Sequence, residues 1–127
     1  PLKPLSVFHA GMQPPGVTPL PRESAFTFDP PVAHQEYKPN ERVRGVLLSQ
    51  FGPAGKTDPA GTHVLVVNLD YQAERTVGLT GPAPLEVFDP ATRQWSPAGG
   101  PPAPLRVHVT TENPVVATEA PITPSAP

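Results

Sequence analysis

The amino-acid sequence predicts a small all-β domain, an antiparallel β-sandwich of about eight short strands. Of the 127 residues, 22 are proline, and they cluster between short apolar runs such as residues 64–69 and 85–88. Proline donates no amide hydrogen and fixes φ at about −65°, so a chain this rich in proline forms short strands joined by stiff turns and excludes long helices. Apolar and polar residues also alternate along several runs, which is the period of a strand.

The first expected strands lie in the N-terminal part of the chain. Residues 5–9 form an apolar run that ends at Gly11, and residues 25–28 alternate small and aromatic side chains before prolines stop the run. Residues 32–37 are expected to form a poorly paired edge segment. The run at 43–51 is apolar on both faces in its middle, which predicts a well-buried strand.

The best candidate for a central strand is the run at 63–69. It is joined to the preceding strand by segment 52–62, whose glycines and prolines predict a hairpin. Because the run is apolar on both faces, we expect the sheet to be covered on both sides at this point. The residues expected to be largely buried are Val64, Leu65, Val66, Val67 and Leu69.

Three more strands are expected toward the C-terminus. Residues 75–79 have a half-buried pattern in which Val77 and Leu79 point inward. Residues 105–109 alternate with a clean period of two, so one side of that strand is expected to face water. Residues 115–117 are the last short strand candidate.

A second hairpin is expected between residues 85–88 and 94–96. The sequence Asp-Pro-Ala-Thr at 89–92 places aspartate first and proline second, which suits a type I turn. The chain is therefore expected to form a single sandwich domain over residues 1–120, followed by a proline-rich tail at 121–127.

Composition narrows the function classes. Nine Lys and Arg residues and 11 Asp and Glu residues are scattered without runs and give a formal net charge of −2. No nucleic-acid partner and no anionic membrane surface are expected from such a balance. Cysteine is absent, which removes disulfides, thiolate catalysis and zinc–thiolate sites. The sequence predicts no cofactor and no metal site.

No catalytic residue is predicted. Cleavage of a glycoside needs two carboxylates that converge across the scissile bond, whereas Glu86 with Asp89 and Asp70 with Glu74 are merely neighbours near turns. The histidines lie on separate segments without metal-ligand spacing. They are His9, His34, His63 and His108.

Three residues are singled out for contacts. A lone tryptophan in a small sandwich usually fills the core, so core packing is the first interpretation of Trp95. The alternatives for Trp95 are a platform for a sugar ring, helped by Tyr71 or Tyr37, and an interdomain contact. For Asn68 a structural role is expected, in which its amide bonds backbone groups of the adjoining turn.

Several segments, taken in order, resemble the C-terminal β-sandwich that follows the catalytic (β/α) barrel in many bacterial glycoside-hydrolase-like proteins. The resemblance covers roughly residues 5–117. It is carried by residues 5–9 with a following glycine, 16–21, a strand ending near 51, 63–71, and 85–90 with Trp95. In that family the acid and base lie in the barrel, which this chain lacks, so the resemblance implies no activity for this chain itself.

The resemblance implies a noncatalytic accessory domain of a carbohydrate-active enzyme. Its expected partners are the catalytic barrel of a parent chain or a carbohydrate, contacted through Trp95 or Tyr71. An extracellular or periplasmic location goes with this expectation. The alternative is a free-standing immunoglobulin-like or fibronectin-like interaction module of a secreted or surface protein, which the same strands allow.

Overall fold

A computed structural model describes residues 3–12, 16–53, 63–70, 72–107 and 115–119 of the chain, the last segment by its backbone only. This part of the chain contains nine β-strands and no helix. The strands are β1 (Lys3–Gly11), β2 (Thr27–Phe28), β3 (Gly45–Gly52), β4 (His63–Asn68), β5 (Arg75–Thr80), β6 (Leu85–Asp89), β7 (Gln94–Pro97), β8 (Ala103–Val107) and β9 (Val115–Glu119). The predicted tail at 121–127 lies outside the described residues.

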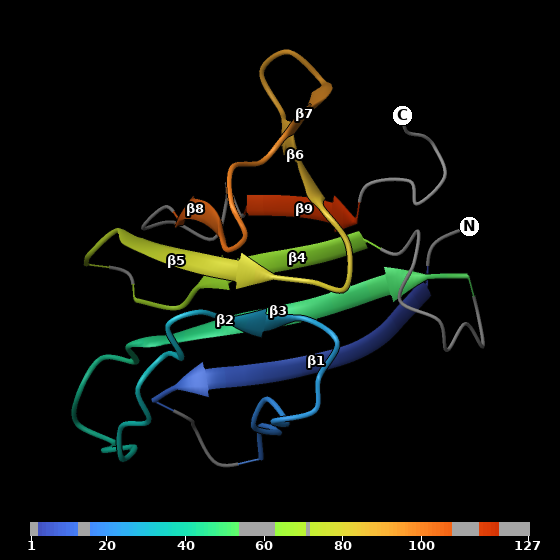
Figure 1. Cartoon of the computed structure of the whole chain (residues 1–127). Helices are drawn as coiled ribbons and strands as arrows, with labels where there is room; N and C mark the ends of the chain where they lie inside the picture. The colour runs from blue at the N-terminus through green and yellow to red at the C-terminus, as the bar shows by residue number, and fades with distance from the viewer. Residues whose placement is uncertain (1–2, 13–15, 54–62, 71, 108–114, 120–127) are drawn as a thin grey trace.

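The strands form two antiparallel sheets that pack face to face. The larger sheet has six strands in the order β1, β3, β4, β9, β6, β7, and the smaller has three in the order β2, β5, β8 (Figure 1). Both predicted hairpins are present, since β3 pairs with β4 and β6 pairs with β7. The prediction of a small antiparallel β-sandwich is confirmed, and β4 occupies the interior position expected of it.

Prolines within strands occur only at sheet edges in the described part of the chain. Pro4 lies in β1, Pro97 ends β7 and Pro104 lies in β8, and each of these strands is at the edge of its sheet. Such a position costs no ladder hydrogen bond when the missing amide would face away from the neighbour. This explains why β8 starts at Ala103, two residues before the predicted strand, and includes a proline.

The core is the layer between the two sheets. Strand β4 contributes the fully buried Val64 and Val66, and β3 contributes Val46 and Leu48. The smaller sheet covers them with the inward residues of β5 and β8, which alternate as predicted with exposed or partly exposed residues in β5 and exposed residues in β8. The complete cluster is Phe26, Phe28, Val46, Leu48, Val64, Val66, Val77, Leu79, Leu85, Ala103, Leu105 and Val107.

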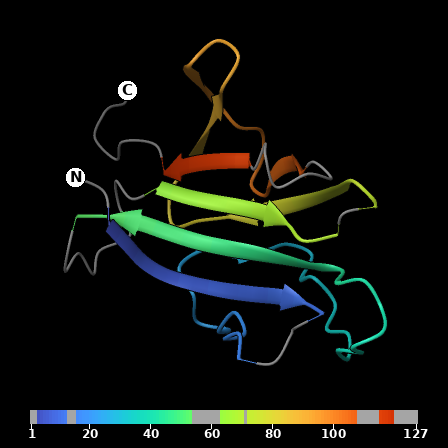
Figure 2. The same ribbon diagram turned by 180° about the vertical axis from the view of Figure 1, so that it is seen from behind.

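The prediction that β4 is covered on both sides is wrong. Its burial alternates strictly: Val64 and Val66 are buried, whereas Leu65, Val67 and the following Leu69 are only partly buried. The reason is that the smaller sheet covers one face of the larger sheet, and no described strand lies over the other face (Figure 2). We call this second face the outer face.

The expectation for residues 32–37 also needs correction. These residues form no strand, and of them only Gln35 makes an isolated bridge, to Met12. In the loop between β6 and β7, the Arg93 amide donates to the carbonyl oxygen of Asp89 at 2.7 Å. Arg93 then takes a positive φ of 58°, which closes the hairpin. The Asp89 carboxylate also accepts a hydrogen bond from the Ala91 amide at 2.9 Å.

The one-sided core predicts unequal costs for two chemically identical substitutions. Leu48 points into the core and is 1% exposed, whereas Leu65 is partly exposed on the outer face. We expect Leu48→Ala to lower the free energy of unfolding by about 2–5 kcal/mol. Leu65→Ala should cost about 1 kcal/mol, because the truncated methyl groups are already in contact with water. Urea titration of both variants measures the difference, and equal costs would show that the outer face is covered.

Candidate functional site

The outer face of the larger sheet carries a row of apolar side chains. The strand registers place Val7 opposite Ser49 and Ser49 opposite Leu65, and they place Leu47 opposite Val67. Val7 is 48% exposed, Leu47, Leu65 and Val67 are partly buried, and Ser49 between them is buried. Apolar residues that alternate with core residues along a strand normally signal a second covering layer. Here that layer is absent from the described part of the chain.

Trp95 extends this face toward the edge of the sheet. Its ring lies 5.1 Å from the ring of Phe88, its neighbour across the β6–β7 hairpin, and 5.7 Å from the ring of His63 in an edge-to-face arrangement. The tryptophan remains 37% exposed. The first interpretation of Trp95, core packing, is therefore wrong. The physical reason is that β7 is an edge strand in a hairpin that projects past the smaller sheet (Figure 1).

Asn68 ends β4, at the turn that leads into β5. The Asn68 side chain donates to the carbonyl oxygen of Ala73 at 2.8 Å and accepts from the Asp70 amide at 3.0 Å. These are bonds to backbone groups of the adjoining turn, and Asn68 itself is buried. Tyr71 lies outside the described residues.

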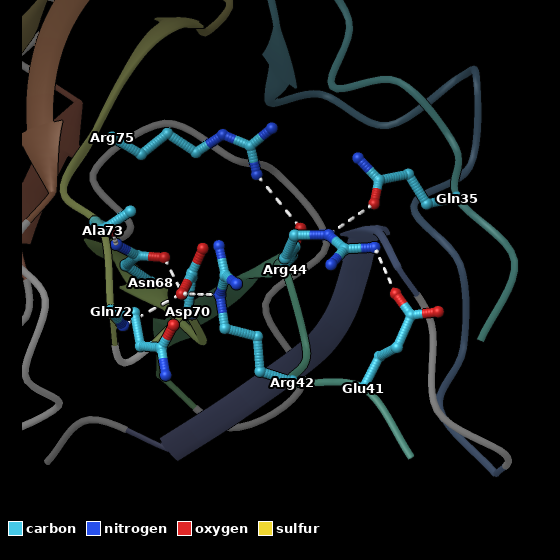
Figure 3. A network of polar contacts seen from close by, with 9 residues as sticks. All are labelled: Gln35, Glu41, Arg42, Arg44, Asn68, Asp70, Gln72, Ala73 and Arg75. Atoms are coloured by element: carbon cyan, nitrogen blue, oxygen red, sulfur yellow. Dashed lines mark hydrogen bonds and ion pairs between the residues drawn. The ribbon is translucent and has the colours of Figure 1, made fainter. Parts of the chain in front are cut away.

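A polar network surrounds this turn (Figure 3). The Asp70 carboxylate accepts from Nε of Arg42 and from the Gln72 amide, both at 2.9 Å. Burial alone raises the pKa of Asp70, but the hydrogen bonds from Gln72 and Arg42 and the charges of Arg42 and Arg44 lower it, and the net result is a pKa below the ordinary value. Asp70 is therefore a charged structural anchor.

Arginines link the network to the loop before β3. Arg44 donates from Nε to the Gln35 side chain at 2.9 Å and from a terminal nitrogen to Glu41 at 3.0 Å. The guanidinium of Arg75, from the start of β5, donates to the Arg44 carbonyl oxygen at 3.2 Å. Together these contacts fasten the loop to the ends of β3 and β5 (Figure 3).

Three of the four carboxylates considered as catalytic pairs take part in such contacts. Asp70 pairs with Arg42, and Glu74 accepts a hydrogen bond of 2.6 Å from Nε of Arg106. In the other pair, Asp89 bonds the Ala91 amide within its own turn. An acid and base for glycoside cleavage must hold different protonation states beside the substrate. Asp70, Glu74 and Asp89 are therefore engaged in structural contacts.

No group of three or more metal-ligating side chains comes together among the described residues. The same residues include no helix long and apolar enough to cross a membrane. His9 is 2% exposed, and neither of its ring nitrogens has a hydrogen-bond partner within the described segments. Sequence reasoning did not single it out for contacts, although its place in the apolar run at 5–9 was the available signal.

Comparison of the chain with family models, with curated proteins and with solved structures found no significant match.

The Asp70 network predicts a pH-dependent contribution to stability. We expect Asp70→Asn to lower the free energy of unfolding at neutral pH by about 1–3 kcal/mol, because hydrogen bonds to a charged group are lost. The folded-state pKa of Asp70 lies below the unfolded-state value, so this contribution is present above about pH 4 and is lost as the pH falls through the folded-state pKa. Urea titrations across this range, on wild type and variant, measure the effect.

The wild type should therefore lose more stability on acidification than Asp70→Asn does. Arg42→Gln removes the other partner of the ion pair and, like Asp70→Asn, should make the free energy of unfolding less dependent on pH. If Asp70→Asn follows the wild-type curve in parallel at every pH, the ionised Asp70 is not the stabilising partner.

Proposed function

We propose that this chain is a noncatalytic accessory β-sandwich domain of a glycoside-hydrolase-like enzyme. In this proposal the outer face packs against the catalytic barrel of the parent chain. The exposed ring of Trp95 borders that contact and meets a glycan. The proposal starts from the resemblance of residues 5–117 to such domains. The observation that carries it furthest is the apolar outer face, over which no strand lies in the described part of the chain.

The outer face has the chemistry of a protein contact. Contiguous apolar surface on a soluble domain commonly marks an interaction site. Val7, Leu47, Leu65 and Val67 belong to three adjacent strands, and the antiparallel ladder holds them in fixed register. An apolar surface held in fixed register suits permanent packing against a neighbouring domain.

The Trp95 cluster supports the glycan part of the proposal. A pyranose presents an apolar face of C–H groups that packs well on a flat aromatic ring. Phe88 and His63 hold the tryptophan ring from two sides, so little side-chain entropy is lost on binding. Trp95 is exposed enough for a sugar to reach it.

The noncatalytic part rests on the carboxylates. Within the described residues, Asp70, Glu74 and Asp89 are each held by structural partners. We therefore expect the chain alone to hydrolyse no chromogenic glycoside. Turnover that survives repurification would overturn this part of the proposal.

The alternative is a free-standing interaction module, whose outer face would bind a different protein. Reading the coding sequence upstream of Pro1 distinguishes the two. A segment encoding a (β/α) barrel supports the accessory domain, whereas unrelated β-domains or a chain start would support the alternative.

The glycan part of the proposal predicts that binding depends on the indole ring of Trp95. Calorimetric titration of the chain with oligosaccharides should give weak binding, which Trp95→Ala abolishes while the far-ultraviolet circular dichroism spectrum is unchanged. Fold retention is expected because Trp95 is not in the core. The same titration with Tyr71→Ala tests whether Tyr71 helps Trp95 to bind the sugar ring, as the sequence analysis suggests.

Leu105→Ala serves as the matched structural control. Leu105 is 2% exposed in the core, so this variant lowers stability without touching the Trp95 cluster. Retained glycan affinity in folded Leu105→Ala together with lost affinity in Trp95→Ala supports the proposal. Equal affinity in wild type and Trp95→Ala would remove the glycan role and leave only the docking role.

A further inference from the structure

A cavity opens between the two sheets at the edge of the sandwich formed by β1 and β2. Its volume is about 670 Å³, within the range of small-molecule sites. Leu20, Phe28 and Val32 give it an apolar interior, and all three belong to the core or pack against it. It involves neither Trp95 nor the apolar residues of the outer face, so it is independent of the proposed function.

The walls of this cavity are held by backbone contacts. The His9 amide donates to the carbonyl oxygen of Thr18, and the Leu20 amide donates to the carbonyl oxygen of His9, both at 2.9 Å. On the opposite wall, Phe28 pairs with Leu79 of β5. The lining prolines fix φ on either side of these contacts and are Pro19, Pro21 and Pro31. A cavity built this way is formed before any ligand arrives.

The polar residues that line the cavity favour an anionic head group. Arg22 and His34 contribute nitrogen donors at exposed positions, against a single carboxylate, Asp29. His9 and Ala10 of β1 complete the wall, with Ala10 pointing inward and the His9 ring lying against Gly45 on the other face of the sheet.

We propose that this cavity binds a small amphipathic carboxylate. The apolar body lies against Leu20, Phe28 and Val32, and the carboxylate accepts hydrogen bonds from Arg22 or from the ring of His34. This arrangement removes apolar surface of the cavity from water.

The test is an NMR titration of the isotope-labelled chain with octanoate, and with 1-octanol as the neutral probe of equal length. Octanoate should shift the amides of β2 and of residues 19–34 saturably at millimolar concentration or below. Arg22→Gln should weaken octanoate binding by about two- to fivefold, as expected of an exposed charge pair, and leave 1-octanol binding unchanged. Arg93→Gln, an exposed arginine in the β6–β7 turn, is the matched control and should behave as wild type.

A cavity-filling variant provides the second arm. Val32→Phe should weaken both probes, provided that its spectrum shows the native fold. The proposal is overturned if octanoate gives no saturable shifts, if 1-octanol binds as tightly as octanoate, or if Arg93→Gln weakens octanoate binding as much as Arg22→Gln. Because Arg22 is exposed, its substitution remains informative even where Val32→Phe fails to fold.

Discussion

The structure depends on the unequal size of its two sheets. A three-stranded sheet covers one face of a six-stranded sheet, and the side chains between them form the single buried cluster of the described residues. Hydrophobic residues make up only 37% of the chain, and most of the strand residues that β5 and β8 contribute on their other face are polar or exposed. The interior strands β3 and β4 are the exception. They are apolar on the covered face and on the open one.

That exception connects the fold to function. Leu47, Leu65 and Val67 would be ordinary core residues if another layer lay over them, and as they stand they form a surface suited to a partner. Trp95 adds an exposed aromatic ring to the same side of the sheet, in contact with His63 of β4. The polar network around Asp70 lies at the end of β4 and fixes the turn into β5. The single strand β4 therefore contributes residues to the core, to the outer face and to this network.

Much of the fold follows from local physical rules that a sequence displays. Proline cannot donate to a ladder, so the strands that contain a proline lie at sheet edges, and the alternation in β5 and β8 gives their inward faces directly. The predictions that were wrong concern features that depend on segments distant in the sequence. Apolar residues on both faces of β4 indicate that both faces can be covered, but whether a covering layer exists is decided by the strands available elsewhere in the chain. The core interpretation of Trp95 was wrong for the same reason, since nothing local reveals that its hairpin extends past the smaller sheet.

The bond from Asn68 to Ala73 was foreseeable in kind, because a buried amide at a strand end must find backbone partners. The cavity beside β1 could not be anticipated, because it joins segments that are separate in the sequence.

The most direct test of the central claim measures the solvent exposure of methyl groups on the two faces of β3 and β4. In the isolated chain, a soluble paramagnetic gadolinium chelate should strongly broaden the methyl resonances of Leu47, Leu65 and Val67. It should leave those of Leu48, Val64 and Val66 sharp, because they lie between the sheets. Equal protection of both sets would contradict the account, since it would mean that the outer face is already covered and is not free to bind a partner.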